Sequence, residues 1–270
     1  MRPTKPRMRL VTSTALAAFL SLQLAACKTT GSSDFTGSIN AASAPRSDAE
    51  WRREAQVWGE RYNRNNSDAE AAYRYARALR ATGQRPQAAA VLEQASINNP
   101  KNTVLLGAYG RALADIGSFN QALEVLSRAH TPDQPDWRIL SAQGAVLDQM
   151  SRHEEARRYY SSALKIMPDE PSVLSNLGLS YALARNLPKA EEVLRRASTQ
   201  GNAEPRVRQN LALVVGLQGR YSEAETIARG DLSPDEAMAS VAYLRQMLEQ
   251  EKGRKNRKGV PNALKEAASS

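Results

Sequence analysis

Residues 103–136, TVLLGAYGRALADIGSFNQALEVLSRAHTPDQPD, contain the pattern from which the architecture follows. A small residue, Gly110, stands near the middle of a first helical segment, where it would let a paired helix approach closely, and apolar Leu113 follows three residues later. Gly117 marks the turn, because a helix end commonly needs a residue with a positive φ. Ala122 stands at the expected crossing point of a second segment. The stretch therefore predicts two close-packed helices joined by a tight turn.

The same slots recur along the chain with a period of 34 residues. Units in register, without a gap, begin at Ala69, Thr103, Trp137, Pro171 and Pro205. The small-residue slot of the first helix holds Ala76, Gly110, Gly144, Gly178 and Ala212, and the alanine slot of the second helix holds Ala88, Ala122, Ala156, Ala190 and Ala224. The turn slot holds Gly83, Gly117 and Gly219, while Ser151 and Arg185 occupy it in the third and fourth units. Self-similarity at a fixed period of this length indicates a repeat protein.

This pattern resembles the tetratricopeptide repeat over residues 69–230. The resemblance implies an all-α solenoid, a right-handed superhelix of about five helix-turn-helix repeats. The sequence departs from the family where a tryptophan is usual, at Ala72, Leu106, Leu140, Leu174 and Arg208. Ala228 also stands where a large apolar residue is usual, so we expect a less regular fifth unit.

Both ends of such a stack need covering, because a solenoid exposes apolar surface there. We expect an N-terminal capping helix within 49–68, since Asp48 to Arg64 looks helical, and a C-terminal capping helix over 231–251 that opens at Ser233. Residues 252–270 are charged and polar, and they are predicted to form a basic disordered tail.

Composition also favours an all-α fold. Apolar residues make up 41% of the 270 residues and aromatic residues only 6%. Alanine and leucine, which have high helix propensity, supply most of the apolar content. The formal charge is +9, but four basic residues lie in 2–9 and five in 252–258, so the body between them is close to neutral. A nucleic-acid-binding protein would be expected to carry a basic face on its folded part, and the sequence shows none.

Residues 1–26 have the layout of a secretory signal peptide, with positive charges in 2–9 and then the uncharged stretch 10–26. This stretch is interrupted by polar residues and is shorter than the roughly 20 apolar residues that span a bilayer, so a permanent transmembrane helix is the weaker interpretation. Its end, Leu24-Ala25-Ala26-Cys27, resembles the lipobox of bacterial lipoproteins, which implies that Cys27 is acylated. The alternative is an ordinary signal peptide with a chance cysteine beside its cleavage site.

The residues after Cys27 indicate where the chain is held. Lys28 stands where lipoproteins of this kind use aspartate for retention in the inner membrane. The resemblance therefore implies a lipid anchor in the outer membrane, with the protein facing the periplasm. Residues 27–48 are rich in Ser, Thr, Gly and Ala and are predicted to form a flexible tether.

No motif for catalysis or for a cofactor stands out. The sequence has no glycine-rich phosphate loop, no zinc-ligand spacing and no nucleophile elbow. His130 follows a second helix and His153 begins one, so we expect solvated or capping histidines that do not meet. We therefore predict a protein that is not an enzyme, with no metal, no cofactor and no small-molecule substrate.

Stacked repeats present their first helices on a concave side, the usual ligand groove of such arrays. The family's groove positions select a polar, basic end with Tyr73, Arg77, Arg80 and Arg111. They also select an apolar end with amides, made of Asn176, Leu179, Leu183, Asn210, Leu213 and Leu217. In family members an asparagine in the slot of Asn176 and Asn210 hydrogen-bonds the backbone of an extended peptide. The alternative is that these leucines pack under neighbouring helices while the asparagines cap helices or face water.

Segments 75–80 (YARALR) and 210–217 (NLALVVGL), with the lipobox, the tether and the run 233–250, are similar to the TadD family. These are lipoproteins of the tight-adherence (Flp) pilus assembly system. The resemblance implies a pilotin-like protein that helps an outer-membrane secretin to assemble or localise. Two alternatives remain: a scaffold for other cell-envelope or peptidoglycan machinery, and an accessory subunit of a periplasmic enzyme whose active site is on another polypeptide.

Overall fold

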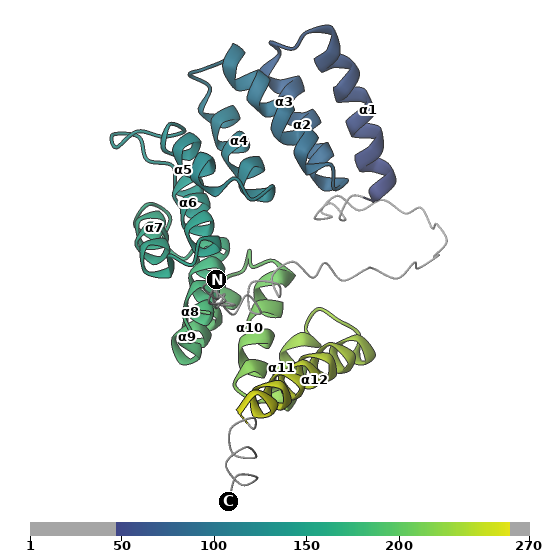
Figure 1. The fold of residues 1–270 in the computed structure, drawn as a ribbon, viewed down its shortest axis with the longest axis vertical. Coiled ribbons are helices and arrows are strands. Elements are labelled where there is room, and N and C mark those ends of the chain that lie inside the picture. Colours follow the sequence, from purple (N-terminus) through teal and green to yellow (C-terminus); the bar gives the residue numbers. More distant parts are fainter. Residues whose placement is uncertain (1–46, 260–270) are drawn as a thin grey trace, which may run out of the picture. The chain divides into compact units, whose positions relative to one another are not determined.

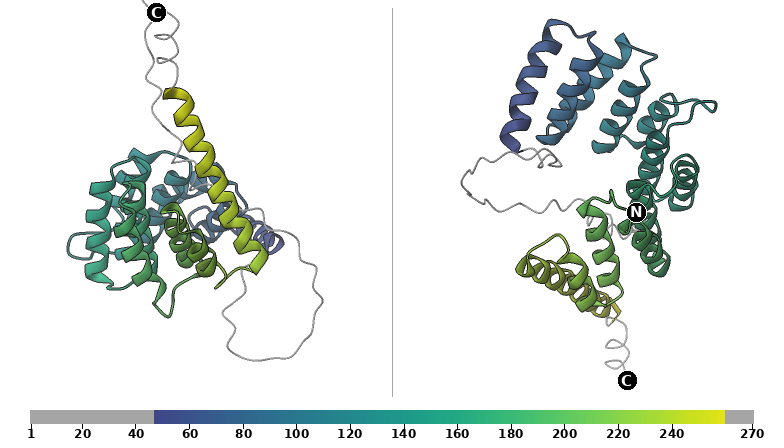
Figure 2. Two further views of the ribbon diagram at one scale, coloured as in Figure 1. Left: turned by 90° about the horizontal axis from the view of Figure 1, so that it is seen from below. Right: turned by 180° about the vertical axis from the view of Figure 1, so that it is seen from behind.

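The computed structural model describes residues 47–259, which form twelve α-helices (Figure 1). The helices are α1 Asp48–Arg64, α2 Ala69–Ala81, α3 Arg85–Asn98, α4 Thr103–Asp115, α5 Phe119–Ser127, α6 Trp137–Gln149, α7 His153–Ile166, α8 Pro171–Leu183, α9 Leu187–Ser198, α10 Pro205–Leu217, α11 Tyr221–Ala228 and α12 Pro234–Gly259. They follow one another along the stack in chain order, as the colours show from two further directions (Figure 2). The prediction of an all-α stack of helix-turn-helix repeats is confirmed.

The helix starts follow the repeat register. Each first helix, from α2 to α10, begins at the residue where its unit begins, and each second helix begins 34 residues after the previous one. Polar side chains cap several of these starts and accept a backbone N–H of the first turn, namely Asp68, Asn102, Asp136, Glu170 and Asn186. Such caps satisfy donors that a helix start leaves without a partner. Local side-chain chemistry therefore sets the boundaries.

The turn between the two helices has the same backbone in every repeat. A positive φ occurs at Gly83, Gly117 and Gly219, and also at Ser151 and Arg185, where glycine is missing. The next residue donates its N–H to the carbonyl five residues earlier, as Gln84 does to Leu79 at 2.8 Å. This is the bond of a Schellman motif, which ends a helix and reverses the chain.

Inside each repeat the small-residue slot receives a side chain of the second helix. A Cβ added at Gly110 would lie 2.5 Å from Leu126, and one at Gly178 would lie 2.6 Å from Leu194. At Gly144 the added atom would meet the ring of Tyr160 at 2.6 Å. The alanines of the second-helix slot are fully buried in all five repeats. The predicted close approach of the paired helices is thus present.

The two ends are covered by helices. At the first end α1 packs on α2, with Gly59 against the ring of Tyr75. At the other end α12 packs on α10 and α11, and its buried Leu244 lies against Gly216. The helix α12 continues to Gly259, whereas the sequence predicts an end at 251 and a disordered tail from 252. Residues 252–258 contain no proline, and the next proline is Pro261. The rest of the predicted tail lies outside the described residues.

The fifth repeat differs where the sequence departs from the family pattern. Arg208, in the tryptophan slot, donates a hydrogen bond of 2.7 Å to Asp231 in the segment before α12. The small side chain of Ala228 is buried together with Ala212 and with Ala237 of α12. The terminal helix therefore fills the space that a large residue takes in a regular repeat.

None of the helices in 47–259 is long and apolar enough to cross a bilayer. The predicted signal peptide, the lipobox with Cys27 and nearly all of the predicted tether lie outside the described residues.

Candidate protein-binding face

The first helices lie side by side along the stack. Contacts join α2 to α4, α4 to α6, α6 to α8 and α8 to α10, so that the first helices form a continuous layer (Figure 1). The second helices make their main contacts with first helices instead of with one another. The layer whose helices are closer together lies on the inner side of a curved stack. The first helices therefore provide the inner surface of the described repeats.

The ten residues of the predicted groove all come from this layer. We call them the first-helix face: Tyr73, Arg77, Arg80, Arg111, Asn176, Leu179, Leu183, Asn210, Leu213 and Leu217. Every one is half-buried, being neither enclosed in the core nor fully exposed. Residues with this burial are held in place by their neighbours while part of their surface stays accessible.

The basic end is partly engaged within the chain. Arg77 of α2 lies over the ring of Trp51, with 5.3 Å to the centroid, and 3.5 Å from a carboxylate oxygen of Glu54. Arg80 is paired with Asp115 at the end of α4. These contacts were not predicted from the sequence, because α1 and α4 reach α2 only through packing.

Arg111 of α4 differs from the other two arginines of the basic end because it bonds to a backbone oxygen and not to a carboxylate. Its Nη2 donates a long hydrogen bond of 3.4 Å to the backbone oxygen of Arg138, at the start of α6. Burial lowers the pKa of the Arg111 guanidinium, and the positive charge of Arg80 lowers this pKa further. Both effects act against the charged form, and they outweigh the opposite influence of Tyr73 and Asp136.

The apolar end carries two equivalent amide contacts. Nδ2 of Asn210 donates to the hydroxyl of Ser175 at 2.9 Å, and Nδ2 of Asn176 donates to that of Ser141 at 3.2 Å. Both serines are buried, and each lies on the preceding first helix, 35 residues earlier. The two contacts fix the orientation of both amides. The matching serine slot in the sequence was the signal that could have revealed them.

The leucines of this end do not belong to the core. The four buried hydrophobic clusters of the described chain, with the residues packed against them, include none of Leu179, Leu183, Leu213 and Leu217. The core of α8 and α10 is formed by other residues, among them Leu174 and Val214. These four leucines are therefore half-buried and lie outside the buried clusters of α8 and α10.

Both histidines are half-buried, and they have different side-chain partners, which the sequence did not predict. His153 Nδ1 lies 2.8 Å from Oδ1 of Asp148, a buried carboxylate that also accepts the hydroxyls of Tyr160 and Ser180. Burial, and then the charge of Asp148, raise the pKa of Tyr160. His130 Nε2 lies 3.3 Å from Oε1 of Gln143. The partners of Asp148 come from α7 and α8, so this network joins neighbouring repeats.

A pocket of about 430 Å³ lies elsewhere, along the second helix α7. Its lining is Glu154, Arg157, Arg158, Ser161, Ser162 and Lys165, all from one helix. The lining side chains are all polar or charged and come from a single helix, so we do not assign this pocket to binding. The part of the chain described contains no group of three or more metal-ligand side chains.

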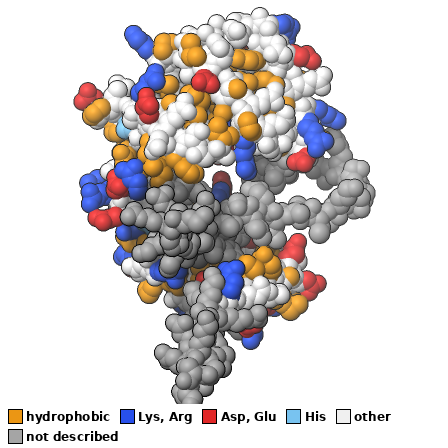
Figure 3. All heavy atoms as spheres, in the orientation of Figure 1, with side chains coloured by type: hydrophobic (Ala, Val, Ile, Leu, Met, Phe, Trp, Pro, Cys, Tyr) orange, Lys and Arg blue, Asp and Glu red, His pale blue; other side chains and the backbone are white. Residues whose placement is uncertain are grey.

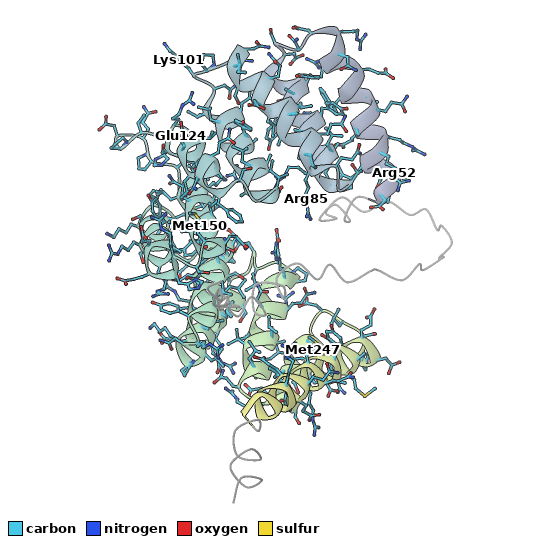
Figure 4. The ribbon with its side chains drawn as sticks, viewed as in Figure 1. Arg52, Arg85, Lys101, Glu124, Met150 and Met247 are labelled. Carbon is cyan, nitrogen blue, oxygen red and sulfur yellow. The ribbon has the colours of Figure 1, made fainter. Side chains whose placement is uncertain are left out.

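Charges of both signs are interspersed on the outer surface visible in Figure 3. Arg85, at the start of α3, and Lys101, in the turn that follows α3, are exposed at opposite ends of that helix (Figure 4). These surface cations contrast with the half-buried arginines of the first-helix face.

Comparison with known proteins agrees with this architecture. Two family models, both described as tetratricopeptide repeat, match residues 73–136 and 149–214. No curated protein is significantly similar to the chain. A crystal structure of PilW, described as a widely conserved type IV pilus biogenesis factor, matches with a TM-score of 0.61 at 14% identity, covering 72% of this chain and 91% of that one. A thermophilic repeat protein of Thermus thermophilus matches with a TM-score of 0.57 at 24% identity, covering 65% and 99%. At such identities the likeness shows the fold alone.

Proposed function

We propose that this tetratricopeptide-repeat chain is a lipid-anchored protein of the outer membrane that helps a tight-adherence (Flp) pilus secretin to assemble or localise. It acts by binding polypeptide on its first-helix face, and it performs no catalysis itself. Its repeats are of a kind that typically serves as a protein-binding scaffold.

The observation that carries binding is the apolar end of this face. Four leucines there are half-buried outside the hydrophobic clusters of the described residues. Full burial of a leucine side chain stabilises by about 1.5–3 kcal/mol. A polypeptide that covers the exposed part of these side chains therefore gains a useful fraction of that energy at each of them.

The amides provide orientation. Nδ2 of Asn176 and of Asn210 each donate one hydrogen bond to a serine hydroxyl. An asparagine amide has two donor hydrogens and an acceptor oxygen. Each side chain therefore keeps one donor and its oxygen for the backbone of an extended peptide, in a fixed direction.

Support for the pilus and for the membrane is of another kind. The lipobox ending at Cys27 and the segments similar to the TadD family motivate both parts of the proposal. The fold of PilW, a pilus biogenesis factor by its description, is compatible with the proposal at the level of architecture.

Pull-down of the tagged chain from detergent-solubilised envelopes of its own bacterium tests the proposal. We expect the double substitution Asn210→Ala and Leu213→Asp to lower the secretin recovered by about tenfold or more, because it removes an oriented amide and places a charge in the apolar end. Quantitative mass spectrometry of the eluate measures the loss.

The matched control is Asn120→Ala with Ile97→Asp, which changes an exposed amide and an exposed apolar residue of second helices. It should leave recovery unchanged. Full recovery by a folded face variant contradicts binding at this face, and capture of peptidoglycan machinery or of an enzyme without the secretin favours the alternatives. A second experiment in the same cells tests the lipid anchor. The Cys27→Ser variant should be lost from the outer-membrane fraction, and a variant that remains in this fraction contradicts lipid anchoring.

A further inference from the structure

Arg111 lies in a space that the neighbouring residues leave for it. A Cβ added at Gly107, one turn earlier on α4, would stand 3.4 Å from Nη1 of Arg111 and 2.6 Å from Cδ1 of Ile139. Glycine at this position therefore leaves room for the guanidinium beside α6. The hydrogen bond to the backbone oxygen of Arg138 holds the other nitrogen.

The charges around Arg111 do not balance. Its electrostatic neighbours are Arg80, Tyr73, Asp136 and Arg138. The carboxylate of Asp115 pairs with Arg80, and Asp136 accepts the backbone N–H of Arg138 as the N-cap of α6. Three guanidinium groups thus face two carboxylates that are already engaged, and among the described residues no carboxylate forms an ion pair with Arg111.

Arg138 belongs to the same group. It is exposed, and its guanidinium lies over the ring of Trp137 with 4.3 Å to the centroid. Its backbone N–H is bonded to Asp136, and its guanidinium has no ion pair in the described part of the chain. A second cation is therefore available beside the first.

We propose that Arg111, assisted by Arg138, binds the carboxylate side chain of an acidic residue in the partner polypeptide. This inference rests on the proposed function, since it assigns a chemical preference to one end of the same face. A guanidinium offers a planar fork of donors that matches the two oxygens of a carboxylate. A carboxylate at this position would add a third negative charge beside the guanidinium groups of Arg80, Arg111 and Arg138.

The repeat register sets the distance from this site to the apolar end. One slot of the first helices holds Arg77, Arg111, Ala145, Leu179 and Leu213 in successive repeats. Arg111 and Leu179 are thus two helix spacings apart, through the contacts of α4 with α6 and of α6 with α8. At about 8–10 Å per spacing, this is about 16–20 Å. An extended chain of about five or six residues covers that distance, so the bound segment should carry its acidic residue about that far from an apolar pair.

Two synthetic ten-residue peptides test the site by fluorescence anisotropy on the full chain in detergent. The first has Asp at its second position and Leu at its eighth and ninth, joined by Ser and Gly, and the second has Asn in place of Asp. We expect the Asp peptide to bind about tenfold more tightly, because a hydrogen bond to a charged group is stronger than one to a neutral group. The substitution Arg111→Gln should remove this difference, so that the Asp peptide and the Asn peptide bind with the same affinity.

Controls separate this site from general effects of charge and of folding. The substitution Arg85→Gln removes an exposed cation at the start of α3 and should keep the preference for the Asp peptide. The substitution Arg111→Lys keeps the charge without the planar fork, and it should retain only part of the preference. Circular dichroism confirms that each variant is folded.

Equal affinity of the two peptides, binding of neither peptide, or a preference that persists in the folded Arg111→Gln variant would overturn the inference. Displacement of the Asp peptide by mixed micelles of detergent and phosphatidylglycerol, but not by mixed micelles of detergent and phosphatidylcholine, would assign the site to lipid phosphate and would also overturn the inference. The substitution Leu213→Asp should weaken the binding of both peptides to the same extent. If it has no effect while Arg111→Gln still removes the preference, the apolar part of the proposed function fails and the carboxylate site stands.

Discussion

At the scale of single residues, side-chain size sets how closely the two helices of a repeat approach. The glycines in the small-residue slot face Leu126, Tyr160 and Leu194, which occupy one equivalent position on successive second helices. A methyl group in that space overlaps a buried side chain in a close-packed interior. Whether the slot can hold alanine instead of glycine therefore depends on the side chain of the second helix that packs against it.

The substitution Gly178→Ala should destabilise the chain by about 1–3 kcal/mol, as overpacking of a core does. The added Cβ would lie 2.6 Å from Cγ of Leu194, which is fully buried. Urea denaturation followed by circular dichroism measures the shift in midpoint. The substitution Gly201→Ala, at a position with nothing within 4 Å, is the control and should change little. A Gly178→Ala variant as stable as the parent would show that α8 and α9 can move apart at no cost.

At the scale of elements, an ionic cluster joins α9 to α11 and to the turn between α10 and α11. The carboxylate of Glu191 accepts hydrogen bonds from Arg195, from Gln218 at 2.7 Å and from Arg220 at 2.6 Å. Burial opposes the charged form of Glu191, but the hydrogen bonds from Arg220, Gln218 and Arg195 outweigh it and lower the pKa to about 2. Arg195 also pairs with Glu223 of α11, so the cluster links the second helices of the fourth and fifth repeats.

This cluster makes stability depend on pH in a defined direction. Because the folded pKa of Glu191 lies below the ordinary value of 4.5, its contribution is fully present above pH 4.5 and is lost as the pH falls towards 2. The substitution Glu191→Gln should cost on the order of 1–3 kcal/mol at pH 7, and this difference should shrink steadily below pH 4.5. Urea midpoints at several pH values measure it. The control Glu154→Gln removes an exposed ion pair with Arg158 and should leave the free energy of unfolding almost unchanged at every pH. A Glu191→Gln cost that does not vary with pH would contradict this account.

At the scale of the whole molecule, the described chain is held together by contacts between neighbours. The helices that pack together lie one or two places apart in chain order. In such a stack, stability is a sum of repeat and interface terms, so damage at one end spreads only as far as those interfaces transmit it. The buried Leu244 of α12 therefore protects mainly the repeat beside it.

The substitution Leu244→Asp should increase amide hydrogen exchange in α10, α11 and α12 by about tenfold or more, while exchange in α2 to α5 stays the same. Mass spectrometry of peptic fragments locates the change. The control Tyr243→Asp alters an exposed neighbour on the same helix and should have little effect. Exchange that rises equally in α2 and α10 would show that the chain unfolds as one cooperative unit.

Much of the architecture followed from local rules. The period of 34 residues indicated where each first helix begins, and the turn slot indicated a positive φ even at Ser151 and Arg185. The end of α12 was predicted less well, because its charged helix formers are equally typical of a disordered tail. The residues of the first-helix face were predicted from their positions in the repeat. The contacts that their side chains make could not be predicted in this way.

The number, order and register of the helices are contained in the amino-acid sequence, because caps, turns and small-residue slots act within a few residues of one another. Packing was needed to bring together polar groups of neighbouring repeats, as Asn210 meets Ser175 and His153 meets Asp148. Packing also leaves Arg111 with an unbalanced charge while Arg80 is paired. The reason is that such pairings depend on the spacing and rotation of packed helices, which many side chains set together and no local pattern contains.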